Sequence, residues 1–454
     1  MRFAGLGLLF AIAVLALPAQ DTRTVTEPHV PPACIALRAH VRAERGAIAM
    51  ADEHRLDTAR IQQAMDHCRS GQAVVLQPAG DKQVFLTGPL ELRSGVTLVV
   101  AANVVLMGSR DPRVYDLAPG SCGVVSEKGH GCKPLIRAEG ATNSGIMGDG
   151  AIDGRGGAKL LGQNVSWWDL AHEAQVRDLY QSVPWLIILH HADNFTMYRI
   201  TLRNSPMFHV SVGETNGFTA WGVKIWSPQR ARNTDGIDPS SSRNVTITHC
   251  FIHTGDDNVA IKSSAAGPSS HISVVHNHFY TGHGMSIGSG TDGGVDHLLV
   301  EDLTIDGADN GIRIKSDRSR GGLVHDVVYR DVCMRNVKNP LMFTPFYAKL
   351  AGGLIPVYRD IHLTDVHIET PGTYTLEGFD AAYKLGLQFD NLFADDQEDS
   401  RFLARDAEIA IGPRRGNLAP GGDDVSAKIL PGSVSGKPLA CATRYIDFSA
   451  AAEK

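Results

Sequence analysis

The sequence has no strong excess of either charge, no long apolar run beyond its N-terminus and no Cys-x-x-Cys pair. Its 454 residues carry 43 basic and 49 acidic side chains, a net charge of −6, so nothing in this balance predicts a nucleic-acid partner. Without a further long apolar run, we expect the mature chain to be soluble, with no membrane partner. The missing cysteine pairs argue against a structural zinc site. Hydrophobic residues make up 43% and charged residues 20%, which excludes a largely disordered chain.

The first twenty residues have the features of an export signal. Arg2 supplies a positive charge, and the run from Ala4 to Leu17 is apolar but too short to span a bilayer comfortably. Cleavage near Gln20 would release the rest of the chain. We therefore predict a signal peptide over residues 1–20 and a secreted protein, with an uncleaved anchor as the alternative.

Seven cysteines in an exported chain permit disulfides. They fall into two pairs and three single residues: Cys34 with Cys68, Cys122 with Cys132, and then Cys250, Cys333 and Cys441. The two pairs flank the first helical segment and a glycine-rich loop, and they are the predicted disulfides. Of the other three, the first two lie inside repeats and are expected to be core residues or free thiols, while the last has no obvious partner.

One helix is predicted over residues 53–69. Leu56, Ile61, Ala64 and Met65 recur there at helical spacing and form an apolar stripe. A helix in this place could cap the open end of a repeat structure, whose exposed core needs cover.

Residues 154–187 interrupt the β pattern that follows this helix. Trp167-Trp168-Asp169-Leu170 leads into a helical run through Tyr180, so we predict a helical excursion beside the main body. Its two tryptophans could stack on sugar rings or pack the helix down, and both readings stay open. Residues 396–454 form a tail of uncertain structure, and we expect residues 21–454 to form a single domain.

A repeat is visible from about residue 195. An apolar residue recurs at relative positions 0 and +2, usually with another at +5. Eight segments follow this pattern at intervals of 23 to 34 residues, and they begin at Phe195, Phe218, Val245, Ile272, Leu298, Val327, Ile361 and Leu387. Alternation within each segment excludes helical repeats, and variable spacing indicates loops of different length on a regular coil. The sequence therefore predicts an all-β parallel β-helix; a β-sandwich, the alternative, would show turns at shorter intervals.

Four polar clusters fall between these alternating stretches. They read Asn233-Thr234-Asp235, Gly255-Asp256-Asp257, Gly282-His283-Gly284 and Arg313-Ile314-Lys315. Successive clusters are roughly one coil apart, and coils stack at about 4.8 Å. Three carboxylates, one imidazole and two cations would then meet in one groove.

The chemistry of such a groove follows from crowding of the carboxyl groups. Asp256 and Asp257 are expected at the turn that enters the next strand, because adjacent residues within a strand point to opposite faces. Crowding drives carboxyl pKa values apart, so that one group keeps a proton while others stay ionised. Glycoside hydrolysis needs that division between an acid and a base. His283, one coil on, can hydrogen-bond to a carboxylate and hold its protonation state.

Arg313 and Lys315 alternate around Ile314, so a strand would place both cations on the outer face, where they could bind a sugar carboxylate. Taken singly, each of these charged residues is more often a solvated surface residue. The two aspartates of the second cluster and His283 could instead hold a metal ion, although we expect no metal and no cofactor. The remaining histidines, among them His190, His191 and His276, are expected to be exposed or satisfied.

In order and spacing, the four clusters resemble the signature motifs of polygalacturonases, glycoside hydrolase family 28. The similarity extends from about Cys34 to about residue 395 and is closest to bacterial endo-acting members at Trp167-Trp168-Asp169-Leu170, Asn204-Ser205-Pro206 and Gly217-Phe218-Thr219-Ala220-Trp221. The resemblance implies a right-handed parallel β-helix. It also implies hydrolysis, with inversion, of α-1,4 bonds between galacturonic acid units of pectin (polygalacturonic acid), and we expect a monomer.

The resemblance also implies residue roles, motif by motif. Asp256 resembles the general acid, Asp235 and Asp257 the pair that activates water, and His283 the histidine that supports the acid. Arg313 and Lys315 resemble the residues that bind the galacturonate carboxylate, and Asn233 and Tyr347 further groove residues. Trp185 departs from the pattern, because bacterial members tend to have a basic residue there.

Several other functions remain alternatives. Exo-action and cleavage of a rhamnogalacturonan backbone use the same chemistry with different groove ends. A pectate lyase is also a β-helix, but it would need calcium carboxylates and a basic proton abstractor. A non-catalytic β-helix that adheres to polysaccharide is the alternative from another class of protein.

Overall fold

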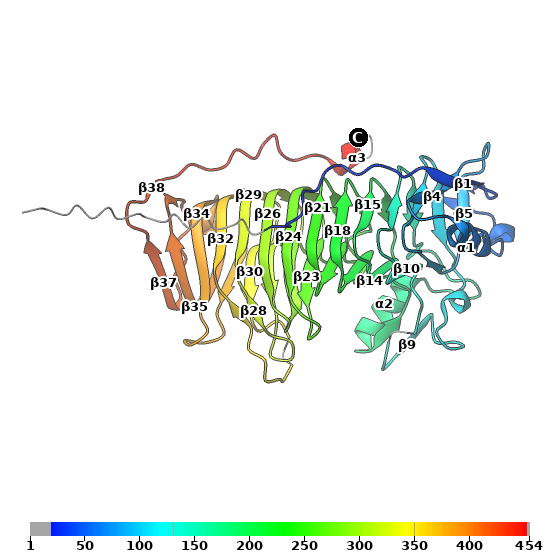
Figure 1. Cartoon of the computed structure of the whole chain (residues 1–454). Coiled ribbons are helices and arrows are strands. Elements are labelled where there is room, and N and C mark those ends of the chain that lie inside the picture. Colours follow the sequence, from blue (N-terminus) through cyan, green and yellow to red (C-terminus); the bar gives the residue numbers. More distant parts are fainter. Residues whose placement is uncertain (1–19, 130, 349, 452–454) are drawn as a thin grey trace, which may run out of the picture.

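Stacked parallel strands make up most of the structure, a computed structural model that describes residues 20–129, 131–348 and 350–451 (Figure 1). The strands lie side by side along one long solenoid, from the blue N-terminal end to the orange C-terminal end. The predicted parallel β-helix is confirmed. The predicted signal peptide, except for its last residue, lies outside the described residues.

Three rows of strands form the walls of the solenoid. The first, called here the groove row, comprises β6 (Leu90–Glu91), β10 (Ile136–Glu139), β14 (Ile187–His190), β17 (Val210–Gly213), β20 (Ile237–Ser240), β23 (Val259–Ser263), β25 (Met285–Thr291), β27 (Asn310–Lys315), β30 (Asn339–Thr344) and β33 (Thr373–Glu377).

The second row comprises β1 (Ala33–Arg38), β4 (Gln72–Gln77), β7 (Val96–Val100), β11 (Gly145–Met147), β15 (Phe195–Tyr198), β18 (Asn216–Trp221), β21 (Arg243–Thr248), β24 (Ser269–Phe279), β26 (Val295–Asp306), β29 (Val327–Arg335), β32 (Ile361–Ile368), β34 (Leu385–Ala394), β35 (Arg401–Ile411) and β37 (Asp423–Ile429). The third row comprises β5 (Val84–Thr87), β8 (Val105–Gly108), β12 (Ala151–Asp153), β16 (Thr201–Arg203), β19 (Lys224–Trp226) and β22 (Phe251–His253). From β24 onward, strands of the second row are long enough to bend into the third.

Shorter elements decorate these rows. Four pairs of short strands are β2 (Ala43–Glu44) with β3 (Ala47–Ile48), β9 (Val124–Ser126) with β13 (Tyr180–Ser182), β28 (Leu323–Val324) with β31 (Val357–Tyr358), and β36 (Arg414–Arg415) with β38 (Val434–Ser435). The α-helices of the described residues are α1 (Thr58–His67), α2 (Trp167–Val176) and α3 (Phe448–Ala451). Single 3-10 turns span Met50–Asp52, Pro112–Tyr115 and Gln397–Asp399. Among the described residues, no helix has the length and hydrophobicity needed to cross a bilayer.

The register of the second row confirms the repeat read from the sequence. The eight predicted repeat starts are direct partners of one another, from Phe195 with Phe218 to Ile361 with Leu387. Their side chains are buried and belong to one continuous hydrophobic cluster. Asn277, which replaces the apolar residue at one +5 position, is also fully buried, and its amide donates to the carbonyls of Ile247 and Val275. Apart from Asn277, whose partner is Leu303, the repeat positions named here therefore stack apolar side chains on apolar side chains.

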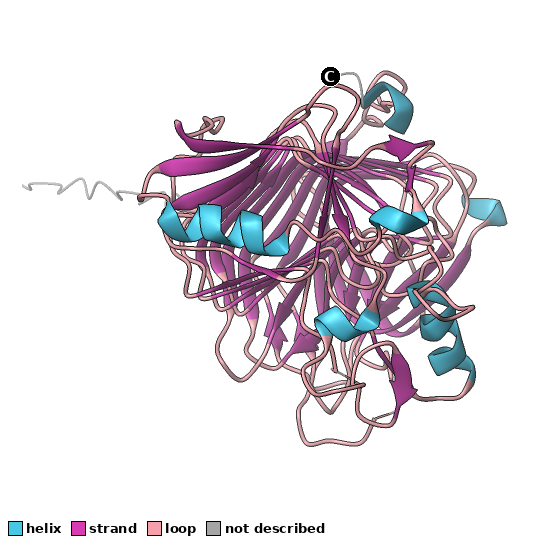
Figure 2. Cartoon of the chain, turned by 90° about the vertical axis from the view of Figure 1, so that its right-hand side faces the viewer, coloured by secondary structure: helices cyan, strands magenta, loops and turns pink. Residues whose placement is uncertain are grey.

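The N-terminal helix exists but is shorter than predicted. α1 packs Ile61, Ala64 and Met65 onto the first coil, and it lies at the end of the solenoid that faces the viewer in Figure 2. The prediction that the helix begins at residue 53 is wrong, and Leu56 is exposed rather than part of the stripe. Glu53 is instead buried between Arg110 and Arg155 from later coils, a contact that local sequence does not reveal.

The excursion at residues 154–187 contains α2, which projects from one side of the solenoid with β9 (Figure 1). The helix ends at Val176, so the prediction that it continues through Tyr180 is wrong: this residue begins β13, which pairs antiparallel with β9. Trp167 is fully buried against Tyr115, and the indole of Trp168 donates to the carbonyl of Ser205. Trp167 therefore packs the helix down rather than offering a sugar platform.

The C-terminal tail first continues the solenoid and then reverses. β35 and β37 add further coils, after which residues 430–447, called here the return strap, run back along the upper side in Figure 1 to α3. Cys441 on this strap is disulfide-bonded to Cys333, which is buried as expected but has no free thiol, and this bond corrects the expectation that Cys441 lacks a partner. The Cys34–Cys68 and Cys122–Cys132 disulfides are confirmed, and Cys250 is a buried free thiol.

Candidate active site

The first three polar clusters each precede a strand of the groove row, and these three strands are neighbours. β20, β23 and β25 are in register through Ile237, Val259 and Met285. Two residues before each of these partners lie Asp235, Asp257 and His283. The backbone N–H of Gly236 donates to the carbonyl of Asp257 at 2.8 Å, which ties the first two clusters together. The predicted stacking of the clusters is thus present in the structure.

Asp257 lies at the centre of the site, in a cage of hydrogen-bond donors. Lys315 Nζ is 2.7 Å from Oδ2, while Arg313 Nη1 and Ser286 Oγ are 3.2 Å and 2.7 Å from Oδ1. The carboxylate is only 1% exposed. Burial alone would raise its pKa, but the positive charges of Lys315 and Arg313 outweigh burial and hold the pKa of Asp257 below its ordinary value. Asp257 is therefore a fixed anion.

Asp256 is the carboxylate of this pair that reaches solvent, with 18% of its side chain exposed. Its Oδ1 is 3.0 Å from Nδ1 of His283 and accepts the backbone N–H of Asp257. Burial raises the pKa of Asp256, but the hydrogen bond to His283 more than compensates and leaves the pKa lowered. As predicted, both aspartates precede β23, where each can reach the groove.

Asp235 lies one coil before Asp257 in a different electrostatic environment. Its Oδ2 is 3.4 Å from Nζ of Lys262, its Oδ1 accepts no hydrogen bond, and the residue is 4% exposed. Asp238, which follows on β20, is 2.5 Å from the same Nζ. Burial, reinforced by the negative charge of Asp256 and Asp238, raises the pKa of Asp235 well above its ordinary value. Burial likewise raises the pKa of Asp238 to about 6.

A buried histidine fixes the backbone of Asp235. His209 is fully buried, and its Nδ1 is 3.0 Å from the carbonyl oxygen of Asp235. Its Nε2 is 3.0 Å from the hydroxyl of Ser227. Burial lowers the pKa of His209 to about 4, so the ring is neutral and adds no charge to the site. His209 is thus a positioning residue for the turn that carries Asp235.

The residues predicted to bind substrate lie on two sides of the carboxylates. The ring of Tyr347 is 42% exposed and covers both cations, with its centroid 5.0 Å from Lys315 Nζ and 5.2 Å from Arg313 Cζ. Asn233 accepts a hydrogen bond from Gln181 at 3.1 Å and lines a cavity of about 880 Å³. The cavity lies between the excursion and the groove row.

Trp185, the departure from the family pattern noted in the sequence, lines this same cavity. Trp185 packs against Phe208 with ring centroids 4.7 Å apart, and both side chains line the cavity. Arg232 and Arg320 also line it, and because Arg320 is paired with Asp317, Arg232 supplies the positive charge there. The cavity therefore combines aromatic faces with positive charge, which suits an acidic sugar.

Asp238, Lys262, Ser286 and His209 were not singled out from the sequence. Asp238 and Lys262 occupy the outward positions of Ile237-Asp238 and Val259-Ala260-Ile261-Lys262. Strict alternation along these strands could have identified them, because the residues between them point into the core. Nothing in the sequence indicates that His209 contacts the turn of Asp235.

Electrostatics disfavour the alternative of a metal ion at Asp256, Asp257 and His283. Their ligand atoms lie within 4.8 Å of one another. However, the oxygens of Asp257 already receive Lys315 and Arg313, and a divalent cation would have to bind beside both positive charges. The same cations favour an anionic ligand in the groove.

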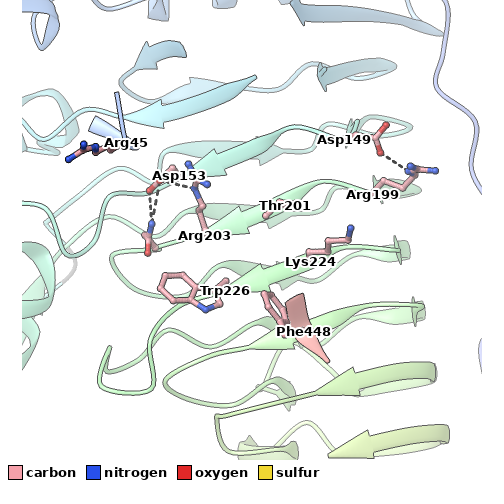
Figure 3. Close-up of a pocket in the computed structure, with 11 residues that line it drawn as sticks. Arg45, Asp149, Asp153, Arg199, Thr201, Arg203, Lys224, Trp226 and Phe448 are labelled. Atoms are coloured by element: carbon pink, nitrogen blue, oxygen red, sulfur yellow. Dashed lines mark hydrogen bonds and ion pairs between the residues drawn. The ribbon is translucent and has the colours of Figure 1, made fainter. Parts of the chain in front are cut away.

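A second cavity, of about 730 Å³, lies on the third row (Figure 3). Two ion pairs line it, Arg199 with Asp149 and Arg203 with Asp153, beside the indole of Trp226. None of the predicted site residues lines this cavity. Arg45 and Lys224 line it as well, so four cations face two carboxylates and charge alone does not distinguish this cavity from the groove.

A parallel β-helix that brings three carboxylates, one imidazole and two cations together in one groove defines the class of this protein as a β-helical enzyme. The model of glycosyl hydrolases family 28 matches residues 68–376. An endo-polygalacturonase of Pectobacterium carotovorum subsp. carotovorum is 45% identical over 388 residues, 85% of this chain and 92% of that protein. A polygalacturonase of Ralstonia solanacearum is 40% identical over 413 residues, 79% of this chain and 78% of that protein.

The solved structure of a polygalacturonase from Erwinia carotovora ssp. carotovora superposes with a TM-score of 0.80 at 43% identity, covering 86% of this chain and all of that one. The chain belongs to glycosyl hydrolases family 28. It is therefore a glycoside hydrolase, as the sequence predicted.

Proposed function

We propose that the protein is an endo-polygalacturonase that hydrolyses α-1,4 bonds between galacturonic acid units of de-esterified pectin. The pair of cations, Lys315 and Arg313, beside Asp257 is the observation that carries this proposal, because two positive charges make the site suitable for an acidic sugar. The endo-polygalacturonase relative, similar over most of both chains, supports the same activity.

The roles proposed for the carboxylates follow from their environments. Asp257, held ionised, orients the attacking water, and Asp235, whose raised pKa makes its ionised form the stronger base, takes the proton of that water, while Asp256 protonates the leaving oxygen. Asp256 has a lowered pKa in the free enzyme. Substrate must therefore raise it, as exclusion of water and an added negative charge both do. His283, bonded to Asp256, is the residue through which that proton is held.

Substrate binding is assigned to the two sides of the groove. Arg313 and Lys315 bind the carboxylate of the galacturonate at the cleaved bond, and Tyr347 lies over them as a wall of that subsite. Asn233 and the cavity beside Trp185 would hold sugars further along the chain. We propose that the enzyme acts outside the cell as a monomer; the three disulfides fit an oxidising compartment.

Incubation with polygalacturonic acid tests the activity. A fast fall in viscosity with mixed oligomers as products supports endo-action, and slow thinning with monomers or dimers would instead show exo-action. Products that absorb as unsaturated uronides would identify a lyase. Binding to polysaccharide without any new reducing ends would leave only an adhesive β-helix.

A substrate with an activated leaving group separates the acid from the base. Asp256→Asn should reduce turnover of polygalacturonate by about 10² or more, yet retain turnover of a nitrophenyl oligogalacturonide, whose leaving group needs no proton. Asp235→Asn should lose activity on both substrates because water activation is still required. Equal losses on both substrates for Asp256→Asn would contradict its role as the acid.

A further inference from the structure

Two adjacent histidines and a glutamate meet at one edge of the groove row, away from the carboxylates of the active site. His190 ends β14, His191 is in the turn that follows, and Glu214 directly follows β17 on the next coil. Glu139, the last residue of β10, is the direct partner of His190 on the preceding coil. Three successive coils therefore contribute to one cluster.

Both imidazole rings are oriented by hydrogen bonds at the same nitrogen. His190 Nδ1 is 2.8 Å from a carboxylate oxygen of Glu139, and His191 Nδ1 is 3.2 Å from the backbone carbonyl of Glu214. With Nδ1 as the donor of each ring, Nε2 is the atom available to a metal ion, which at His190 would take the place of the proton shared with Glu214. A carboxylate or carbonyl on the far nitrogen is the arrangement that orients histidines bound to metal ions.

The two Nε2 atoms point toward a single carboxylate. His190 Nε2 is 3.2 Å from Oε1 of Glu214, and His191 Nε2 is 3.6 Å from its Oε2. Metal–nitrogen and metal–oxygen bonds of about 2.0–2.2 Å in a tetrahedron place neighbouring ligand atoms roughly 3.3 Å apart. The ligand atoms of all three residues lie within 4.8 Å of one another, so small side-chain movements bring them to that spacing.

We propose that His190, His191 and Glu214 form a binding site for a divalent first-row transition metal of the zinc type, with Glu139 orienting His190. Imidazole nitrogens favour zinc, nickel and copper over calcium and magnesium, which prefer shells made of oxygen. The three ligands are between 36% and 55% exposed, so water or an anionic group completes the shell. The ion would join two coils directly and a third through Glu139.

A second histidine pair on the same solenoid provides the contrast. The ligand atoms of His271, His297 and Asp296 also lie within 4.8 Å of one another, but the two rings stack nearly parallel, with centroids 4.5 Å apart and an interplanar angle of 13°. Lone pairs lie in the ring plane, so parallel stacked rings direct them side by side rather than toward one ion. His190 and His191 are inclined by 56°, which allows their nitrogens to converge. His271 is therefore a matched control residue.

The experiment is equilibrium dialysis of the full chain, made without a polyhistidine tag, against Zn²⁺ at about pH 8, where imidazole is neutral. One zinc ion should bind per chain, and Ca²⁺ should not compete with it for the site. His190→Ala, His191→Ala and Glu214→Gln should each weaken binding at least about tenfold, and Glu139→Gln by about 10- to 100-fold. His271→Ala should bind zinc as the unaltered protein does. Zinc should also raise the thermal midpoint of the unaltered protein, because it binds the folded state.

Thermal midpoints measured in a chelator show whether each variant folds normally, so that lost binding is not confused with lost structure. The proposal is overturned if His190→Ala binds zinc as tightly as the unaltered protein, or if His271→Ala weakens binding equally. It is also overturned if zinc binds no more tightly than calcium. None of these outcomes depends on the hydrolytic activity.

Discussion

Asp257 and Asp235 lie one coil apart, and both are almost completely buried, yet their neighbours shift their pKa values in opposite directions. Asp257 receives two cations and a hydroxyl. Asp235 shares a single lysine with Asp238 and retains an oxygen without a hydrogen bond. Burial is thus not what distinguishes the two carboxyl groups: the number of cations per carboxylate does.

Because of this difference, removal of a charged residue should destabilise the fold to a different extent in the two regions. In the cage around Asp257 two cations share one carboxylate, and removal of that carboxylate leaves buried charge without compensation. The Asp235–Asp238–Lys262 cluster has more carboxylates than cations, so it can take up a proton. One region is therefore fixed in charge, while the other is adjustable.

Replacement of one aspartate in each region should give the largest difference in the free energy of unfolding. Asp257→Asn leaves Arg313 and Lys315 buried without their carboxylate and should lower the free energy of unfolding by about 3–5 kcal/mol, besides abolishing activity. Asp238→Asn should change it by less than about 1 kcal/mol at pH near 5, because it replaces a carboxyl that is largely protonated there. Urea unfolding of both variants tests this. Equal losses would show that the two regions do not differ.

Removal of one cation from each region is the second test. Lys315→Met should lower the free energy of unfolding by about 3 kcal/mol, because Asp257 then keeps only Arg313. Lys262→Met should cost about 1 kcal/mol at pH near 5, since Asp235 and Asp238 can remain protonated, and more at pH 7. Thermal unfolding at the two pH values makes the comparison. A cost for Lys262→Met that is independent of pH would contradict an adjustable cluster.

The pH dependence of stability should differ in sign between the regions. The pKa of Asp238 is raised from 3.8 to about 6 in the folded state, so the folded protein binds more protons between these values and loses stability as pH rises through them. The full effect is about 3 kcal/mol. Asp257 has a lowered pKa, so its contribution is present above the ordinary value and is lost as pH falls below it.

Chemical unfolding of the unaltered protein and of Asp238→Asn between about pH 4 and 7 measures this slope. The variant should show a smaller decline with rising pH. An unchanged slope would assign the effect to another group.

The smallest effect is expected at the rim of the cage. Tyr347→Ala removes the ring over Arg313 and Lys315, and a cation–π contact at an exposed site contributes about 0.5–1 kcal/mol. KM for polygalacturonate should rise about two- to fivefold with little change in kcat. Tyr347→Phe, which keeps the ring, is the control. A large fall in kcat would instead place Tyr347 in the chemical step.

Much of the solenoid could be predicted because inward positions of stacked coils meet their equivalents. Phe195 lies on Phe218, so a pattern local to each coil also describes the packing between coils. The clusters around Asp235 and Asp257 were found for the same reason. Partners outside the motifs, such as Lys262, can be identified only from the outward positions of the strands that follow.

What the sequence did not predict depends on contacts between distant segments. Glu53 leaves the helix because Arg110 and Arg155 bind it. Cys441 meets Cys333 because the chain reverses after β37, and no local pattern marks where that strap lands. The pKa values of the three active-site aspartates likewise follow from neighbours contributed by several coils.

The return strap changes how this solenoid can come apart. Each coil is held only by its two neighbours, so a repeat structure opens from its free end. The Cys333–Cys441 bond closes a ring of chain 108 residues in span, within which β30, β33 and β37 lie. Coils inside that ring can fray but remain tethered, and a single proteolytic nick among them would not release the fragment. The C-terminal coils of the enzyme are thus covalently linked to an earlier coil rather than held by strand pairing alone.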